Sequence, residues 1–451
     1  MSKRLMKLVC LVVSMAMLLT LAACGGSKAP AAEDTKVPAA DTAKEPEKKE
    51  ENKEAAAVTY KLRIHYSTDD EKAPTDWAVQ EIAKLMPNVK FEIEPQLNDN
   101  GDSLKARIAT GDLPDFFLIS PMHFDAAINS KSIVNLTGAL DSTGLGKKYI
   151  KSVMDTEVFY KDKQCWAFPI NAGGVDLLYY NKEMFEKNGI KVPTNYPELL
   201  AAVKGFVAKG ITPWPIFAKE AWPIGAYFDA FATKIDPEGM VALSNGTKKA
   251  SDFRPAIEKM TELIKAGVFQ KGATAADYDT ARTMFESGKC PMFLNGEWEI
   301  AGATEALGDK VDFIDNWPTT DPGHENDNLY AMPGASELGG IAVSAKVKNQ
   351  EEAVKVAALL AEYISKGNYV KNSRTDCAVP TDGLTPEKSM APMTKKLLAN
   401  KGSYIIKSSV AHSLPNPKFG TGFGELLQKM VAGMSAEDFI KACDKLQESS
   451  K

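Results

Sequence analysis

One stretch of this 451-residue chain constrains its fold more than any other. Residues 166–170 form a short apolar run closed off by a proline, which predicts the end of a strand. Residues 171–174 lack bulk and include two glycines, so their backbone can take dihedrals that other residues avoid. Residues 175–180 are nearly all apolar, which predicts a buried strand, and Asn181 and Gly189 are suited to begin and end a helix. A chain that passes from one lobe to another needs this order of strand, pliable segment and new strand–helix unit.

The length and charge of the chain narrow its class. A chain of 451 residues is too long for one ordinary core, so we expect two lobes. Its 44% hydrophobic and 25% charged residues are typical of a soluble globular protein. The formal net charge of −5 argues against non-specific nucleic-acid binding, which needs a basic surface.

The first residues are typical of a secretory leader. Residues 1–7 are basic and residues 8–21 form an apolar run, which is too short for a membrane span. The leader ends in Leu-Ala-Ala-Cys24-Gly, which matches the bacterial lipobox, so we expect a signal peptide over 1–23 and acylation of Cys24. The alternative is an ordinary signal with an incidental cysteine.

The next segment, 24–57, is predicted to be a disordered tether. It is rich in Ala, Pro, Glu and Lys and has no aromatic residue, so it cannot bury enough apolar surface to fold. We expect it to hold the folded body off a membrane.

The order of elements over residues 60–119 predicts a parallel sheet covered by helices. Strands are expected at 60–66, 89–93 and 116–119, with helices beginning at Thr75 and Ser103. Ligands of such sheets bind beyond the carboxyl ends of the strands, which places Tyr66 and the segment from Ser120 to His123 at a candidate site.

Two tryptophans are candidate ligand contacts. Trp222 follows Glu220, and Trp298 follows the turn signal Asn295-Gly296. Sugars stack their C–H faces on such rings and hydrogen-bond to carboxylates and amides. By position alone, a tryptophan at a helix start is more often a core residue.

Three motifs resemble one known family. Phe168-Pro169 followed by Leu-Leu-Tyr-Tyr-Asn-Lys at 177–182 resembles the first interlobe crossing of extracellular solute-binding proteins of the carbohydrate (maltose-binding-like) type, which feed ABC importers. Thr-Gly-Asp-Leu-Pro-Asp at 110–115 and the run from Phe285 to Trp298 resemble two further signatures of that family. The resemblance extends from about residue 60 to the C-terminus.

The resemblance implies an α/β, two-lobed periplasmic-binding-protein-like fold. Each lobe would be a mainly parallel sheet flanked by helices, and three interlobe crossings would lie near residues 170, 315 and 380. The N-terminal lobe would comprise 58–169 plus 318–380, and the C-terminal lobe 171–316 plus 384–451.

The same resemblance implies a ligand site. Trp298 would stack on the sugar, Glu220 and Trp222 would match an acidic-x-aromatic segment, and Ser120 and His123 would match a contact loop of the first lobe. That loop, Ile-Ser-Pro-Met-His, lacks the aromatic and charged residues of maltose-type members, which leaves the identity of the sugar open. The expected ligand-binding residues are Tyr66, Ser120, His123, Asn171, Glu220, Trp222, Asn295, Trp298 and Phe419.

Sequence motifs for catalysis and metal binding are mostly absent. The chain has no His-Glu-x-x-His and no phosphate-binding loop, so we expect no enzymatic activity, cofactor or metal. Carboxylate pairs for glycoside hydrolysis form only in space, which keeps a surface carbohydrate-active enzyme as an alternative. Cys165, Cys290, Cys377 and Cys443 show no Cys-x-x-Cys spacing, so we expect buried free thiols. A sharper hypothesis pairs Cys165 with Cys377, since each lies just before a predicted crossing.

Together these observations predict a lipid-anchored, monomeric substrate-binding protein on the extracellular face of a bacterial membrane. It would deliver a saccharide to an ABC transporter permease by hinge closure of two lobes. A binding protein for a non-sugar solute is the second alternative.

Overall fold

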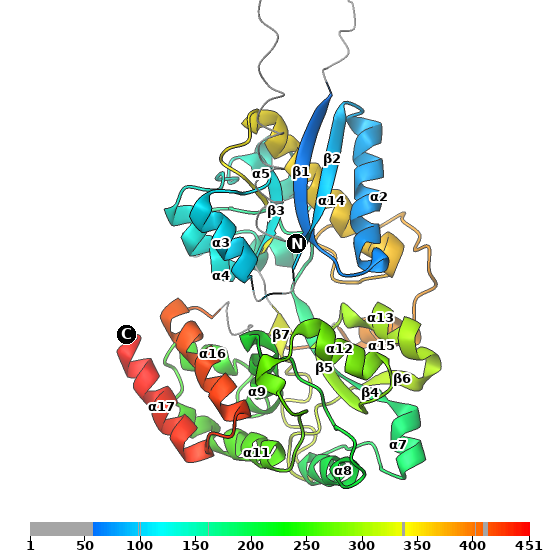
Figure 1. Cartoon of the computed structure of the whole chain (residues 1–451), viewed down its shortest axis with the longest axis vertical. Coiled ribbons are helices and arrows are strands. Elements are labelled where there is room, and N and C mark those ends of the chain that lie inside the picture. Colours follow the sequence, from blue (N-terminus) through cyan, green and yellow to red (C-terminus); the bar gives the residue numbers. More distant parts are fainter. Residues whose placement is uncertain are drawn as a thin grey trace, which may run out of the picture. The chain divides into compact units, whose positions relative to one another are not determined.

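A computed structural model describes residues 57–451, apart from 98, 100, 161, 336–338, 402 and 409–413 (Figure 1). The predicted signal peptide, Cys24 and nearly all of the tether lie outside the described residues. Within the described part, no helix is long and apolar enough to cross a membrane.

The first sheet has the strand order β2–β1–β3–β8. Strands β1 (Val58–His65), β2 (Val89–Gln96) and β3 (Phe116–Ile119) are parallel, as the sequence predicted, and β8 (Gly340–Val343) pairs antiparallel with β3. Leu62 and Ile64 lie in one core, while Arg63 on the opposite side of β1 is also buried. The sheet is therefore covered on both faces by its helices, and β1 is more buried than its alternating sequence indicated. The helices that follow these strands are α2 (Asp69–Leu85), α3 (Asp102–Thr110), α4 (Pro121–Asn129) and α14 (Gln350–Asn372).

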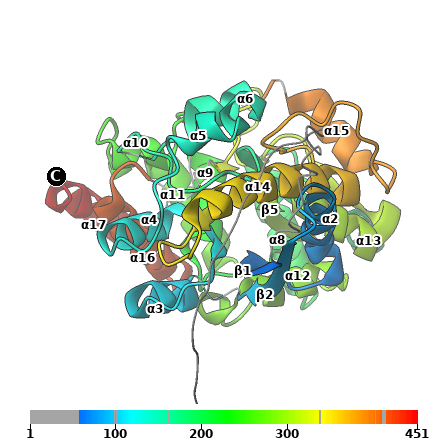
Figure 2. The same cartoon turned by 90° about the horizontal axis from the view of Figure 1, so that it is seen from above.

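Helix α2 begins earlier than predicted. The predicted N-cap, Thr75, is wrong, because the oxygen of Thr68 accepts the backbone N–H of Glu71 and the helix starts at Asp69. Pro74 therefore lies inside the helix and cannot donate to the carbonyl of Asp70. The side chain of Asn372, at the end of α14, donates to that carbonyl over 3.2 Å. Helices α2 and α14 pack side by side, which brings these two groups together (Figures 1 and 2).

The second sheet has β4 (Gly174–Asn181) between β5 (Met292–Gly296) and β6 (Val311–Ile314), and a short β7 (Gly334–Ala335) pairs with the start of β4. All of the described pairings of β4 are antiparallel, so the expectation of a mainly parallel second sheet is wrong. The cause is the position of β4. Strands β5 and β6 are joined by α13 (Glu299–Leu307) and run in the same direction, but β4 lies between them and runs the opposite way.

Helices surround the second sheet, and side-chain caps fix where several of them begin. Asn181 caps α7 (Lys182–Asn188), Asn195 caps α8 (Tyr196–Ala208) and Asp277 caps α12 (Tyr278–Glu286). Gly189, predicted to end α7, has the left-handed φ of 64° that glycine adopts without strain. The other helices around this sheet are α9 (Ala221–Ala232), α10 (Met240–Ser244), α11 (Arg254–Lys265), α15 (Pro392–Lys401), α16 (Pro417–Val431) and α17 (Ala436–Ser449). The short helices α5 (Ala139–Ser142) and α6 (Leu145–Lys148) pack in the core of the first sheet.

Residues that follow β6 stay with the second sheet for longer than the sequence indicated. Trp317 and Met332 belong to the core that contains β4, and β7 pairs with β4. The predicted N-terminal lobe began at 318, whereas in the structure the next pairing with the first sheet is that of β8.

The four cysteines in the described part of the chain are buried free thiols, so the proposed pairing of Cys165 with Cys377 is not present. Asn171 stands opposite Cys377 in an antiparallel bridge, and this register leaves Cys165 six residues away along its own segment. Burial raises the pKa of both thiols to about 12.

Candidate functional site

A cavity of about 720 Å³ opens at the carboxyl ends of the first sheet's parallel strands. One wall comes from residues that follow β1, β2 and β3 and from the start of α2 and the end of α14. The other wall comes from the start of α9, from α12 and from the length of α13. The residues with polar or large side chains on these walls include His65, Asp70, Glu71, Gln96, Leu97, Asp99, Ser120, Met122, His123, Asn171, Glu220, Trp222, Tyr278, Arg282, Glu286, Trp298, Glu305, Asn368, Asn372 and Arg374.

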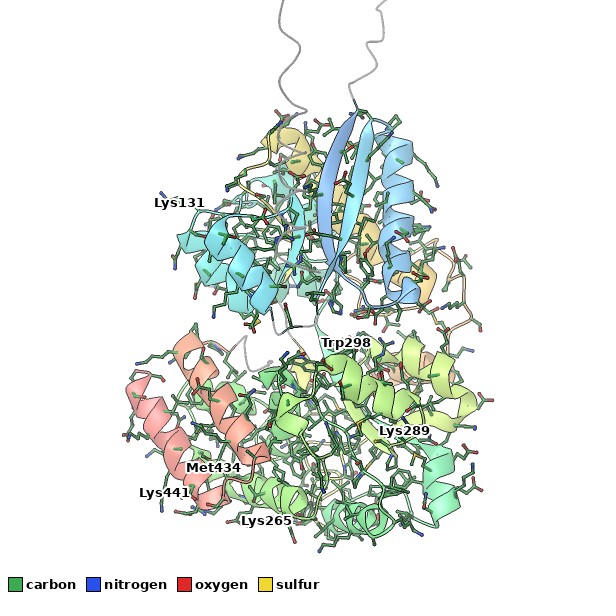
Figure 3. The ribbon with its side chains drawn as sticks, in the orientation of Figure 1. Lys131, Lys265, Lys289, Trp298, Met434 and Lys441 are labelled. Atoms are coloured by element: carbon green, nitrogen blue, oxygen red, sulfur yellow. The ribbon has the colours of Figure 1, made fainter. Side chains whose placement is uncertain are left out.

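Two half-buried tryptophans form the aromatic part of the cavity. The rings of Trp222 and Trp298 meet edge to face, with centroids 5.9 Å apart and an interplanar angle of 62°. The indole Nε1 of Trp222 donates to Glu220 Oε2 over 2.8 Å. Figure 3 labels Trp298 where the chain enters α13. A Cβ on Gly296 would lie 2.2 Å from two carbons of the Trp298 ring, so glycine is the residue that lets this ring fold back over the end of β5.

A charged cluster lies beside the tryptophans. Arg282 of α12 pairs with Glu71 of α2, and its Nε lies 3.0 Å from Glu286 and 3.5 Å from Glu299. Burial raises the pKa of Glu299, and Arg282 opposes that effect. The arginine is therefore held by the carboxyl groups of Glu71, Glu286 and Glu299.

His123 orders the first-sheet wall. Its Nε2 lies 3.0 Å from the carbonyl of Gly101, and a carbonyl only accepts, so Nε2 carries the proton. In the neutral ring Nδ1 then accepts from the hydroxyl of Ser120 over 3.3 Å. The ring is 4% exposed and lies against Gly101, where a Cβ would approach it to 2.2 Å. His123 is thus suited to position Ser120.

The comparison with protein families identifies the chain. The model of the bacterial extracellular solute-binding protein family matches residues 66–365. This chain belongs to that family. The proteins of this family bind solutes and are not enzymes, so the expectation of no catalytic activity holds.

Several relatives of this solute-binding protein carry names that refer to sugars. A multiple sugar-binding protein of Streptococcus mutans serotype c is 26% identical over 368 residues, which cover 78% of this chain and 83% of the relative. A probable sugar-binding periplasmic protein of Brucella suis biovar 1 is 26% identical over 364 residues, which cover 77% and 82%.

Solved structures share its fold. A chitin oligosaccharide binding protein has a TM-score of 0.70 at 20% identity and covers 87% of this chain and 99% of its own. The solute-binding protein RafE, in complex with raffinose, has a TM-score of 0.63 at 20% identity, with 88% and 100% covered. The α/β fold of this solute-binding protein is therefore that of the periplasmic-binding-protein class.

The structure brings six of the nine expected residues to the cavity of the solute-binding protein: Ser120, His123, Asn171, Glu220, Trp222 and Trp298. Three do not line it: Tyr66, Asn295 and Phe419.

The local structure explains why each of these three residues does not line the cavity. Tyr66 lies one residue past the end of β1, and His65 occupies the cavity wall in its place. Asn295 is fully buried, and its Nδ2 donates to Glu299 over 2.9 Å and to the Tyr278 hydroxyl over 3.1 Å. Phe419 is 1% exposed and stacks on Phe423 in the core.

Sequence reasoning missed several lining residues. Gln96 ends β2 and Leu97 and Asp99 follow it, so the tendency of ligands to bind beyond strand ends is the signal that points to them. Arg282 and Asn372 carry no local signal, since only the packing of α12 and α14 brings them to the cavity. Among the described residues, no three His, Cys, Asp or Glu side chains group as metal ligands would.

Proposed function

We propose that this chain is the substrate-binding lipoprotein of an ABC importer and that its cavity binds a saccharide. The observation that carries the proposal is the half-buried pair Trp222 and Trp298, which lines the cavity among carboxylates. Indole faces stack on the C–H faces of sugars, and carboxylates accept hydrogen bonds from sugar hydroxyls. The sugar-binding names of the relatives support the same ligand class.

We propose that binding closes two lobes about a hinge. The first lobe would contain the first sheet and α14, and the second would contain β4–β7 and the helices around them. Segments 171–172 and 376–377 lie side by side, with Ala172 N–H donating to the Asp376 carbonyl over 2.6 Å, and they are suited to serve as two strands of the hinge. The third crossing would come after Trp317 and Met332, which stay with the core of the second sheet, and before β8. A ligand that contacts both walls favours the closed form, because only that form supplies both sets of contacts.

The lipid anchor rests on the lipobox at Cys24. Acylation there, followed by the tether, would place the folded body at the extracellular face of the cell membrane beside its permease. Metabolic labelling with a fatty-acid analogue tests this directly, since a Cys24→Ala chain should lose both the label and its membrane association.

Thermal melting of the chain from residue 57 onward, against a panel of mono- and oligosaccharides, tests the ligand class. A ligand at one hundred times its Kd stabilises the native state by about 2.7 kcal/mol, which raises the melting temperature by several degrees. The shift should fall sharply in Trp298→Ala and persist in Trp166→Ala, because Trp166 does not line the cavity. Circular dichroism checks that both variants fold. A panel that gives no shift, with amino acids or organic acids shifting the melt in its place, would contradict the saccharide.

A further inference from the structure

The first-sheet wall of the cavity carries two large apolar side chains that are exposed to solvent. Leu97 is 61% exposed and Met122 is 41% exposed, and both line the cavity. Leu97 follows β2 directly, and Met122 is the second residue of α4, which follows β3. The two therefore come from strand ends at the edge of the sheet where ligands of this fold bind.

An exposed apolar residue on its own carries little information, because folded surfaces contain many of them. The position of these two is what matters. Both lie on the wall formed by the first-sheet elements, whereas Trp222 and Trp298 lie on the other wall. A ligand that fills the cavity would cover apolar surface on both walls, and covering such surface is favourable in proportion to its area.

Hydroxyl geometry decides which saccharides suit two apolar walls. In a pyranose with equatorial hydroxyls, as in glucose and xylose, axial C–H groups point to both faces of the ring and the hydroxyls point outward around its rim. An axial hydroxyl, as at C4 of galactose, makes one face polar. Buried against Leu97 and Met122, that hydroxyl would lose its hydrogen bonds to water without a replacement.

Polar groups on the cavity walls complete the match. The carboxylates and hydroxyls among the lining residues, which include Asp70, Ser120 and Glu220, are acceptors suited to outward-pointing equatorial hydroxyls. We infer that Leu97 and Met122 form the second stacking surface of the ligand site and select saccharides whose rings have equatorial hydroxyls. This inference rests on the proposed saccharide function.

Two matched sugar pairs test it, because each pair differs only in the configuration at one C4 hydroxyl. Titration calorimetry would compare glucose with galactose and cellobiose with lactose, with xylobiose as a further equatorial probe. We expect the wild-type chain to bind the equatorial member of a pair about tenfold more tightly, as expected for one unpaired buried hydroxyl.

The variants Leu97→Ser and Met122→Ser should reduce both the affinity and the preference for the equatorial member. Leu85→Ser is the matched control, since Leu85 is 56% exposed on α2 and does not line the cavity. The preference ratio is the decisive quantity, because a general loss of stability would lower both affinities of a pair together.

The outcomes separate the two proposals. If no saccharide in the panel binds, the saccharide function fails and this inference fails with it. If saccharides bind but the galactose-type member is equal or preferred, or if Met122→Ser and Leu97→Ser leave the ratio unchanged, the function stands and the inference is overturned.

Discussion

At the scale of single residues, the shape of the cavity depends on two glycines as well as on the side chains that line it. Gly296 and Gly101 each leave room for a ring, that of Trp298 and that of His123, at distances where a Cβ would clash. Neither ring could keep its position over a residue with a side chain. The glycines therefore set the positions of a proposed stacking residue and of the residue that holds Ser120.

Gly296→Ala should displace the ring of Trp298 without unfolding the chain. The added methyl meets ring carbons at 2.2 Å, so the indole has to rotate away from the cavity. Loss of one aromatic stacking contact, worth about 1 kcal/mol, lowers saccharide affinity roughly fivefold to tenfold. Calorimetry on the wild type and the variant measures this loss.

Gly138→Ala is the control, because a Cβ at Gly138 meets nothing within 4 Å and its φ of −68° suits any residue. Unchanged affinity in Gly296→Ala, together with unchanged quenching of tryptophan fluorescence by the ligand, would show that the ring does not depend on this glycine.

At the scale of elements, local signals predicted what local chemistry determines. Strand β4, the cap at Asn181 and the βαβαβ order of the first sheet follow from short-range patterns. Helix α2 begins after Thr68, a threonine that stands before three acidic residues. The prediction placed the start later, at Thr75, because Pro74 disfavours the interior of a helix.

Other features depend on contacts that no local pattern contains. The antiparallel second sheet follows from where β4 inserts, and β5 and β6 are far from it in sequence. The burial of Asn295 and Phe419 follows from packing of α12 and α16, so both looked like site residues in the sequence alone. Motif resemblance located Trp222 and Trp298, and the structure supplied Arg282, Leu97 and Met122 beside them.

One buried carboxylate of α14 accepts from two lysines, one of which joins the helix to α6. Glu362 is 5% exposed, and its two oxygens each lie 2.6 Å from a cation, Lys148 at the end of α6 and Lys366 on α14. Burial opposes ionisation of Glu362, but the two lysines outweigh it, so its pKa is lowered.

Glu362→Gln should destabilise the chain at neutral pH and not in acid. A carboxyl whose folded pKa lies below its unfolded value of about 4.3 adds stability above that pH and loses it as the pH falls through the folded pKa. We expect urea melts at pH 7 to give the variant a free energy of unfolding about 1–2 kcal/mol lower than that of the wild type. Near pH 3 the unfolding free energies of the wild type and the variant should converge.

The control is Glu351→Gln, because Glu351 is 83% exposed at its side chain and pairs only with Lys355 in the described structure. That variant should leave the unfolding free energy nearly unchanged, because exposed ion pairs contribute little. A Glu362→Gln deficit of the same size at pH 7 and pH 3 would mean that packing, and not charge, explains it.

At the scale of the whole molecule, an ion pair joins elements of the two proposed lobes. Glu71 in the first turn of α2 pairs with Arg282 of α12, and both residues line the cavity. The pair favours the arrangement that brings both walls together, and an ion pair between partly exposed side chains contributes up to about 1 kcal/mol.

The variant Glu71→Gln should therefore shift the ligand-free chain toward an open form. Small-angle X-ray scattering would show a larger radius of gyration than the wild type without saccharide, and the same radius once saccharide is saturating, because the ligand supplies the missing preference. Affinity should fall by no more than about fivefold, the factor that corresponds to one such pair.

Raising the salt concentration should move the wild type toward the variant, since partly exposed ion pairs are screened. Asp76→Asn is the control, because Asp76 pairs with Lys72 on the same helix. Equal radii for the wild type and Glu71→Gln at low salt without saccharide would contradict closure controlled by this pair.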